Sequence, residues 1–101
     1  MYHDVNKKRW GEILEKLSEG HFLEKDVFPE TILAIKENKN SILVISELDI
    51  SKYSKKYKKL WQHSYHHDII VKVEIKDNKL HITEFDGTRY TLDLETGKLV
   101  E

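Results

Sequence analysis

The last third of the chain has the most regular pattern of apolar and polar positions. Residues 68–100 alternate apolar and polar side chains in three short blocks, which Asp77-Asn78 and Asp86-Gly87 separate. Alternation with a period of two is typical of half-buried β-strands, and both dipeptides favour tight turns. The pattern therefore predicts a three-stranded antiparallel meander in this part of the chain.

The parity of the apolar positions predicts how these blocks pair. Apolar residues are odd-numbered in the first block and even-numbered in the other two. The first loop must then hold an even number of residues and the second an odd number, because a slip of one residue turns every side chain to the opposite face. A two-residue loop at 77–78 and a three-residue loop at 86–88, with Gly87 at positive φ, meet this condition. The predicted inner rows are Val71–Glu84–Tyr90, Val73–Ile82–Leu92 and Ile75–Leu80–Leu94.

Two other stretches have the 3.6-residue spacing of amphipathic helices. Residues 4–19 place apolar side chains on one face, with Asp4 as the N-cap and Gly20 at the C-terminal end. Residues 51–66 begin at Ser51 and place an aromatic and apolar stripe on one face, with lysines around it. The two stripes are Trp10, Ile13, Leu14 and Leu17, and Tyr53, Tyr57, Leu60, Trp61 and Ser64.

Two short apolar runs, at 31–35 and 41–46, lie between these stretches. Their β-branched content favours a hairpin of buried strands, although the first run also fits a helix that begins at Pro29. The predicted order is helix, two strands, helix, three strands. We therefore expect a single α+β domain over residues 1–101, with two helices packed on one face of a roughly five-stranded, mainly antiparallel sheet.

Composition adds several exclusions. The 101 residues are 39% hydrophobic and 35% charged with a net charge of −1, which excludes a disordered chain. No apolar run approaches the ~20 residues of a membrane span, and no apolar leader follows the N-terminus, so we expect a cytoplasmic protein. Fifteen lysines against two arginines indicate AT-rich coding and favour a bacterial or phage origin.

Common catalytic signatures are absent from the sequence. The chain has no cysteine and four glycines, and it has no Gly-rich phosphate loop, no G-x-S-x-G and no H-E-x-x-H. Disulfides, thiolate zinc sites and cysteine nucleophiles are excluded. We therefore expect no cofactor and lean towards a protein that is not an enzyme.

A histidine cluster is the first candidate for chemistry. His63, His66 and His67 have i, i+3, i+4 spacing, so a continuing helix would place their imidazoles on one side. Such a set can bind zinc or nickel, or act with Tyr65 as acid–base groups of a metal-independent ribonuclease. Histidines near a helix C-terminus also gain from the helix dipole, which requires no ligand.

The outer face of the predicted meander holds a second candidate. The predicted register aligns Glu74, His81 and Asp93, which would favour the imidazolium or orient a general base. Charged rows on an exposed sheet are more often simple ladder pairs. Farther along this face, Ile70, Phe85 and Arg89 form a row with two exposed apolar side chains, which fits a protein-binding surface.

The predicted helix at 51–66 is the third candidate. Residues 51–68 carry five lysines and Asp68, a net +4 between two acidic flanks. If the aromatic stripe packs on the sheet, the lysines are only its solvated edge. If not, they form a nucleic-acid surface, for which the contact candidates are Lys52, Lys55, Lys56 and Lys59.

The sequence fits two functions from different classes. The first is a non-enzymatic protein-binding domain, most plausibly an inhibitor or immunity-type protein that neutralises a toxin or nuclease by surface complementarity. Its partner contacts would be the acidic outer side of the first helix and the exposed sheet row, that is Glu12, Glu15, Glu19, Ile70, Phe85 and Arg89. The second is a nucleic-acid-binding protein or small ribonuclease. We expect Glu84 at the sheet edge with its carboxylate in water, and the pattern specifies neither the partner nor the oligomeric state.

Overall fold

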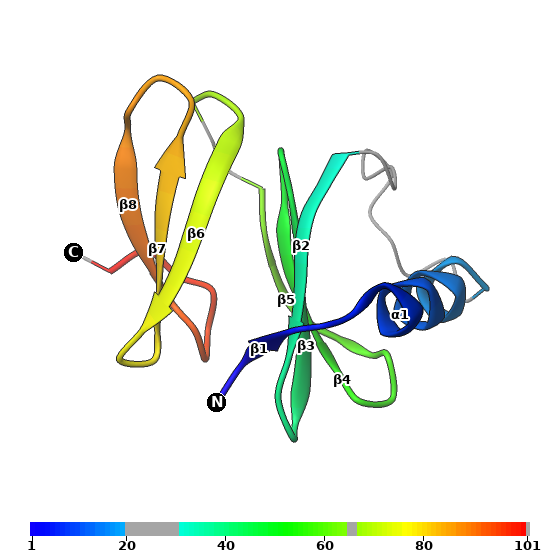
Figure 1. Ribbon diagram of the computed structural model, residues 1–101. Coiled ribbons are helices and arrows are strands. Elements are labelled where there is room, and N and C mark those ends of the chain that lie inside the picture. Colours follow the sequence, from blue (N-terminus) through cyan, green and yellow to red (C-terminus); the bar gives the residue numbers. More distant parts are fainter. Residues whose placement is uncertain (20–30, 65–66, 101) are drawn as a thin grey trace.

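The computed structural model describes residues 1–19, 31–64 and 67–100, which form one helix and eight strands in three layers (Figure 1). The helix α1 lies on one side of a five-stranded sheet of order β1-β2-β3-β4-β5, and a three-stranded sheet of order β6-β7-β8 lies on the other side. All strand pairs are antiparallel. The elements are β1 (His3–Asp4), α1 (Lys7–Glu19), β2 (Ile32–Glu37), β3 (Ser41–Ser46), β4 (Ile50–Ser54), β5 (Lys59–His63), β6 (Ile70–Lys76), β7 (Lys79–Glu84) and β8 (Arg89–Asp93).

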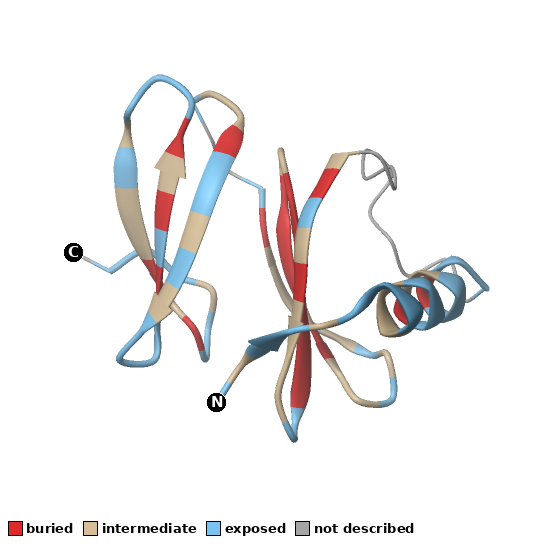
Figure 2. Cartoon of the chain, viewed as in Figure 1, coloured by how far each residue is buried: buried red, intermediate tan, exposed pale blue. Residues whose placement is uncertain are grey.

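The central strand β3 takes part in two hydrophobic cores. All six of its residues are buried (Figure 2). Ile42 and Val44 belong to the cluster between the large sheet and α1, whereas Leu43 and Ile45 belong to the cluster between the two sheets. A strand covered on both faces is expected as an unbroken apolar run, which is what the sequence has at 42–45.

The prediction of two helices on one face of a single sheet is wrong, and the α+β class is confirmed. In place of the predicted second helix, β4 and β5 form a hairpin whose turn contains Tyr57 at φ 65°. Tyr53 packs in the helix-side core and Trp61 in the inter-sheet core, on opposite faces of the sheet. Pairing with β3 therefore overrides the local helical spacing.

The first helix is confirmed, with a later start than expected. Asp4 lies in β1 rather than at the N-cap. Asn6 caps the helix instead, because its side-chain oxygen accepts a hydrogen bond of 2.9 Å from the backbone N–H of Arg9. Gly20 and Pro29 lie outside the described residues. The hairpin of β2 and β3 is confirmed.

The meander is confirmed as a separate sheet. Asp77 and Asn78 form its first turn, both at positive φ, and Ile75 lies opposite Leu80 as predicted. The second loop is odd in length and has Gly87 at φ 91°, but it lies one residue earlier than expected. The register of β7 and β8 is therefore shifted by two, which keeps each side chain on its predicted face.

An ion-pair network fastens α1 to the edge of the large sheet. The Arg9 guanidinium donates two hydrogen bonds of 3.0 Å to the Glu37 carboxylate, and Lys55 contacts the same carboxylate. The Glu37 side chain is 13% exposed. The hydrogen bonds from Arg9 lower the pKa of Glu37 from 4.5 to about 2. One carboxylate therefore joins the helix, β2 and the β4–β5 turn.

The turn that follows β8 is fastened to β5. The Trp61 indole donates a hydrogen bond of 3.0 Å to the Leu94 carbonyl, and Gly97 lies against the indole ring at φ 73°. A Cβ at this glycine would lie 2.5 Å from two ring carbons. Gly97 therefore allows both the turn conformation and the close approach of the ring.

We predict that Gly97→Ala lowers the free energy of unfolding by roughly 2–3 kcal/mol, because alanine meets both the strained φ and the Trp61 ring. Gly11→Ala is the matched control: it lies in α1 with no atom within 4 Å of an added Cβ. Removing a helical glycine should raise stability by up to about 1 kcal/mol. Urea unfolding of both variants measures the difference, and equal effects would contradict the assignment.

We predict that the stabilisation from Glu37 depends on pH. Because its pKa is lowered on folding, the carboxylate stabilises the fold fully above pH 4.5, and this contribution is lost as the pH falls towards 2. Glu37→Gln should therefore cost on the order of 2 kcal/mol at pH 7 and much less near pH 2. The control is Glu12→Gln, an exposed carboxylate on α1. Urea unfolding across this pH range should show a loss that shrinks with acid only for Glu37→Gln.

Candidate binding surfaces

A groove lies between the adjacent edges of the two sheets, with a volume of about 310 Å³. One side is formed by β2 with β1 and the start of α1, and the other side is formed by β6. Eight of its eleven lining residues are apolar, and the other three carry charged side chains. We call it the edge groove; its lining residues are Asp4, Val5, Trp10, Leu33, Ala34, Ile35, Lys36, Ile45, Val71, Lys72 and Val73.

Two β-bulges shape the edge groove. In β2 the register shifts between Ile32 and Ala34, so Leu33 is the extra residue. In β6 it shifts between Ile70 and Lys72, so Val71 is the extra residue. Their side chains are 41% and 46% exposed, although each strand is otherwise anchored in a core. Bulges re-aim side chains at sheet edges, and here two of them turn aliphatic groups from different sheets to one groove.

The second bulge overturns the predicted exposure of Ile70. That residue is 1% exposed and packs in the inter-sheet core, while Val71 takes the outward position. The backbone N–H of Ile70 donates a hydrogen bond of 2.7 Å to the backbone carbonyl of Glu47, in the β3–β4 turn. This contact with a distant segment fixes the start of β6 and forces the extra residue outward. The predicted row Ile70–Phe85–Arg89 therefore does not form: Phe85 is exposed in the β7–β8 turn and Arg89 lies in β8.

Glu84 is also placed differently from the prediction. Its side chain is 1% exposed rather than in water. The carboxylate accepts hydrogen bonds from the backbone N–H groups of His67 and Asp68, at 3.2 Å each. It lies opposite Ile70 because of the bulge. Glu84 thus accepts hydrogen bonds from the backbone of the segment that precedes β6, in keeping with the rule that buried charges are hydrogen-bonded.

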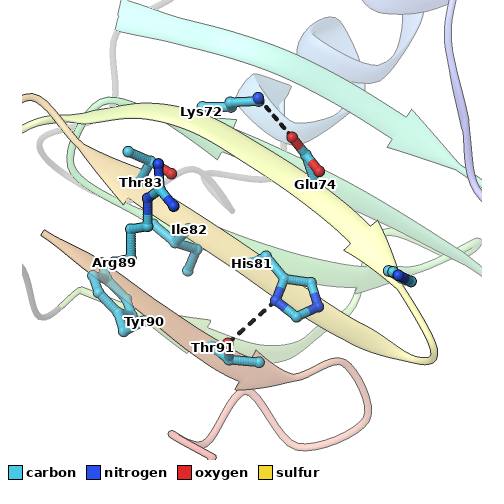
Figure 3. A pocket seen from close by; sticks show the side chains of 9 residues that line it. Lys72, Glu74, His81, Ile82, Thr83, Arg89, Tyr90 and Thr91 are labelled. Carbon is cyan, nitrogen blue, oxygen red and sulfur yellow. Dashed lines mark hydrogen bonds and ion pairs between the residues drawn. The ribbon is translucent and has the colours of Figure 1, made fainter. Parts of the chain in front are cut away.

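A second hollow, of about 530 Å³, lies on the outer face of the three-stranded sheet (Figure 3). Side chains from three neighbouring strands line it, and they include hydroxyl, imidazole, cationic and carboxylate groups. We call it the polar hollow; its lining residues are Lys72, Glu74, Lys76, His81, Ile82, Thr83, Arg89, Tyr90 and Thr91.

Of the predicted row of Glu74, His81 and Asp93, the pairing of Glu74 with His81 is confirmed and the pairing of His81 with Asp93 is wrong. Glu74 lies opposite His81, but the shifted register places Thr91 beside the histidine and Asp93 opposite Lys79. The His81 Nδ1 and the Thr91 hydroxyl oxygen are 3.3 Å apart. The imidazole therefore has one carboxylate neighbour on these strands, and no second carboxylate orients it.

Charge pairing on this face is local. Lys72 and Glu74 form an ion pair of 2.7 Å, and both side chains are more than 60% exposed. The hydrogen bond from Lys72 lowers the pKa of Glu74, and His81 and Arg89 add smaller favourable electrostatic interactions. Lys72 thus neutralises the only carboxylate that lines the polar hollow.

The metal-binding and nucleic-acid-binding residues were predicted on a helix at 51–66, but most of this segment forms β4, β5 and the turn between them. His63 is buried at the end of β5 with its ring 5.6 Å from that of Tyr90, His67 is exposed beyond the strand, and Tyr65 and His66 lie outside the described residues. In residues 1–19, 31–64 and 67–100, no three His, Cys, Asp or Glu side chains are grouped to hold a metal ion.

The lysines of the predicted basic helix are spread over β4, β5 and their turn. Lys52 donates to the Leu94 carbonyl at 3.2 Å, Lys55 pairs with Glu37, and Lys59 donates to Gln62. Lys56 is exposed in the turn. Three of the four predicted contacts therefore have structural partners within the fold.

The acidic residues predicted on the first helix are exposed, but they do not make an acidic surface. Glu12, Glu15 and Glu19 lie on the solvent side of α1. The same helix exposes Lys7, Lys8 and Lys16, the last of these 4.0 Å from Glu19. Because α1 also carries lysines before and among these carboxylates, long-range attraction to a basic partner is weak there.

Sequence reasoning did not identify the edge-groove residues Leu33 and Val71 as surface features. Their one sequence signal is a run of consecutive apolar residues, at 32–35 and 69–71, where strict alternation fails.

Within the described ranges, no helix is long and apolar enough to cross a membrane. Comparison of the chain with models of protein families, with curated proteins and with solved structures finds no match.

Proposed function

We propose that this chain is a non-enzymatic domain that binds an extended segment of another protein in the edge groove. The observation that carries the proposal is the pair of bulges that turn Leu33 and Val71 towards the same groove. Each leaves roughly half an aliphatic side chain in water, which costs free energy unless a partner covers it. Trp10 in the same groove adds the kind of aromatic anchor that is frequent in binding hot spots.

An extended segment fits because β6 is an edge strand of its sheet. Lys76 and Lys79 flank a two-residue turn and so exchange both backbone hydrogen bonds. Every second residue of β6, counted back from Lys76, exchanges backbone hydrogen bonds with β7 in the same way. The backbone N–H and C=O groups of the residues between them, Val73 and Ile75, therefore point to the open edge of the sheet. A partner strand can pair with these groups and place alternate side chains against Leu33 and Trp10.

The rim of the groove favours a partner of mixed charge. Lys36 and Asp4 form an ion pair of 2.8 Å on one side, and Lys72 lies on the other side. An apolar centre with a polar rim is the usual anatomy of a protein interface. We propose an inhibitor or immunity-type role on this basis, in which the domain neutralises its partner by covering part of its surface.

Nucleic-acid binding through residues 52–59 has weaker support. Lys55 is committed to Glu37 and Lys59 to Gln62, so a phosphate would have to compete with existing partners. The ribonuclease alternative required clustered imidazoles, whereas His63 is buried in β5 and His67 is exposed outside it.

We predict that Leu33→Ser combined with Val71→Ser weakens partner binding by about 100-fold, because two aliphatic contacts of roughly 1.5 kcal/mol each are lost. A photo-reactive residue at position 71, introduced in the cells that produce the protein, should cross-link one protein in stoichiometric yield. Mass spectrometry of the cross-linked peptide should identify an extended apolar segment.

The matched controls use Leu60, an exposed aliphatic residue on β5 that is 51% exposed and does not line the groove. A photo-reactive residue at position 60 should not cross-link the same protein, and Leu60→Ser should leave its binding unchanged. Equal cross-linking from both positions, or full binding by the double variant with its fold intact, would refute the proposal. Recovery of RNA without protein would do the same.

A further inference from the structure

We propose that the polar hollow binds the phosphate group of a phosphate ester, with Arg89 and His81 as its principal contacts. Its principal contacts differ from those of the proposed protein contact, because Arg89 and His81 do not line the edge groove, whereas Lys72 lines both. The proposal rests on the charge of the hollow, on an uncommitted guanidinium, and on the hydroxyl groups beside it.

The polar hollow is positively charged in a chain of net charge −1. Lys72, Lys76 and Arg89 line it, and Glu74 is the only acidic residue in its lining, so the net charge is +2 with His81 neutral. Cations gathered in a concave surface raise the local concentration of anions. An anionic ligand is therefore favoured over a neutral or cationic one.

Arg89 is the strongest candidate to contact the anion. Among the residues that the structure describes, its guanidinium has no hydrogen bond or ion pair. The other arginine of the chain, Arg9, is held by Glu37. A guanidinium presents a fork of N–H donors that matches two oxygens of a phosphate. Figure 3 shows the Arg89 side chain crossing its face of the sheet towards Thr83.

The neighbouring groups complete a phosphate site. Thr83 lies opposite Arg89, and Thr91 lies opposite His81. Neighbouring strands lie about 4.8 Å apart and alternate residues of one strand about 6.8 Å apart, so a phosphate between the two pairs has side chains on each side and the long Arg89 side chain can extend to it. The Thr91 hydroxyl contacts His81 Nδ1, which leaves Nε2 directed away from that contact. Hydroxyl and imidazole donors can meet the phosphate oxygens that the guanidinium leaves open.

The negative charge of Glu74 would repel an anion in the polar hollow, and the positive charge of Lys72 offsets this repulsion. The two form an ion pair of 2.7 Å, so the carboxylate is already neutralised before a ligand arrives. A volume of about 530 Å³ accommodates more than an isolated phosphate. Small-molecule sites span roughly 300–1,000 Å³, so the hollow matches a sugar phosphate in size.

The test is a titration of the ¹⁵N-labelled protein, followed by amide shifts. The probes are ribose 5-phosphate, inorganic phosphate, ribose and sodium chloride at matched ionic strength. We expect both phosphate probes to shift the amides of His81, Arg89 and Thr91 in a saturable manner, with ribose and chloride without effect. Equal shifts with chloride or with ribose would overturn the proposal.

Two variants separate a phosphate site from general attraction. Arg89→Lys keeps the charge but loses the fork and should weaken binding of ribose 5-phosphate at least tenfold. Lys98→Ala removes an exposed charge outside the hollow and should leave the affinity within twofold. Equal losses in both variants, or none in Arg89→Lys, would overturn the proposal. The amide spectrum of each variant establishes that its fold is unchanged.

A short DNA duplex identifies the source of the phosphate. If it shifts the same amides at lower concentration than ribose 5-phosphate, and the gain falls steeply with salt, the ester belongs to a nucleic-acid backbone. If ribose 5-phosphate binds at least as well, the ester is a small molecule. Both results support the site, whereas duplex shifts confined to residues 52–59 would move the contact elsewhere and overturn it.

Discussion

The burial of β3 on both faces is the constraint on which the rest of the structure depends. Its side chains alternate between the core under α1 and the core between the sheets, and all six residues are buried. Neither the helix nor the small sheet can therefore be removed without exposing aliphatic side chains of β3 to water. The helix α1 and the small sheet belong to different cores, and β3 couples them because it contributes side chains to both.

The two candidate surfaces lie where this layered packing ends. The edge groove is found between β2 and β6, at the side where the two sheets stop covering each other. Bulges at Leu33 and Val71 place apolar groups there instead of the charges or prolines that usually protect an open edge. The polar hollow lies on the face of the small sheet that has no layer over it (Figure 1).

The sequence was sufficient for elements whose pairing is local. The meander follows from alternation and from turn residues within it, and its first turn and first register were predicted correctly. Its second register was missed by two residues, because Phe85 enters the loop in place of Thr88 and parity alone does not distinguish the two. The alternation therefore predicts which face of the sheet each side chain lies on, but it does not predict which residues of β7 and β8 lie opposite each other.

The elements that depend on distant segments could not be predicted. The spacing of Tyr53, Tyr57, Leu60 and Trp61 fits a helix, yet β4 exists because it pairs with β3. The candidate site shows the same limit. Arg89 and Phe85 are exposed as expected, but Val71 replaces Ile70 at the surface through a contact with Glu47, more than twenty residues earlier.

Native-state hydrogen exchange tests the coupling through β3 most directly. Leu43→Ala trims only the inter-sheet core and Val44→Ala only the helix-side core. If β3 joins the two cores into one cooperative unit, each variant should lower protection equally at the amides of Leu17 in α1 and Leu92 in β8. The account is contradicted if Leu43→Ala loosens the amide of Leu92 alone while that of Leu17 keeps its original protection.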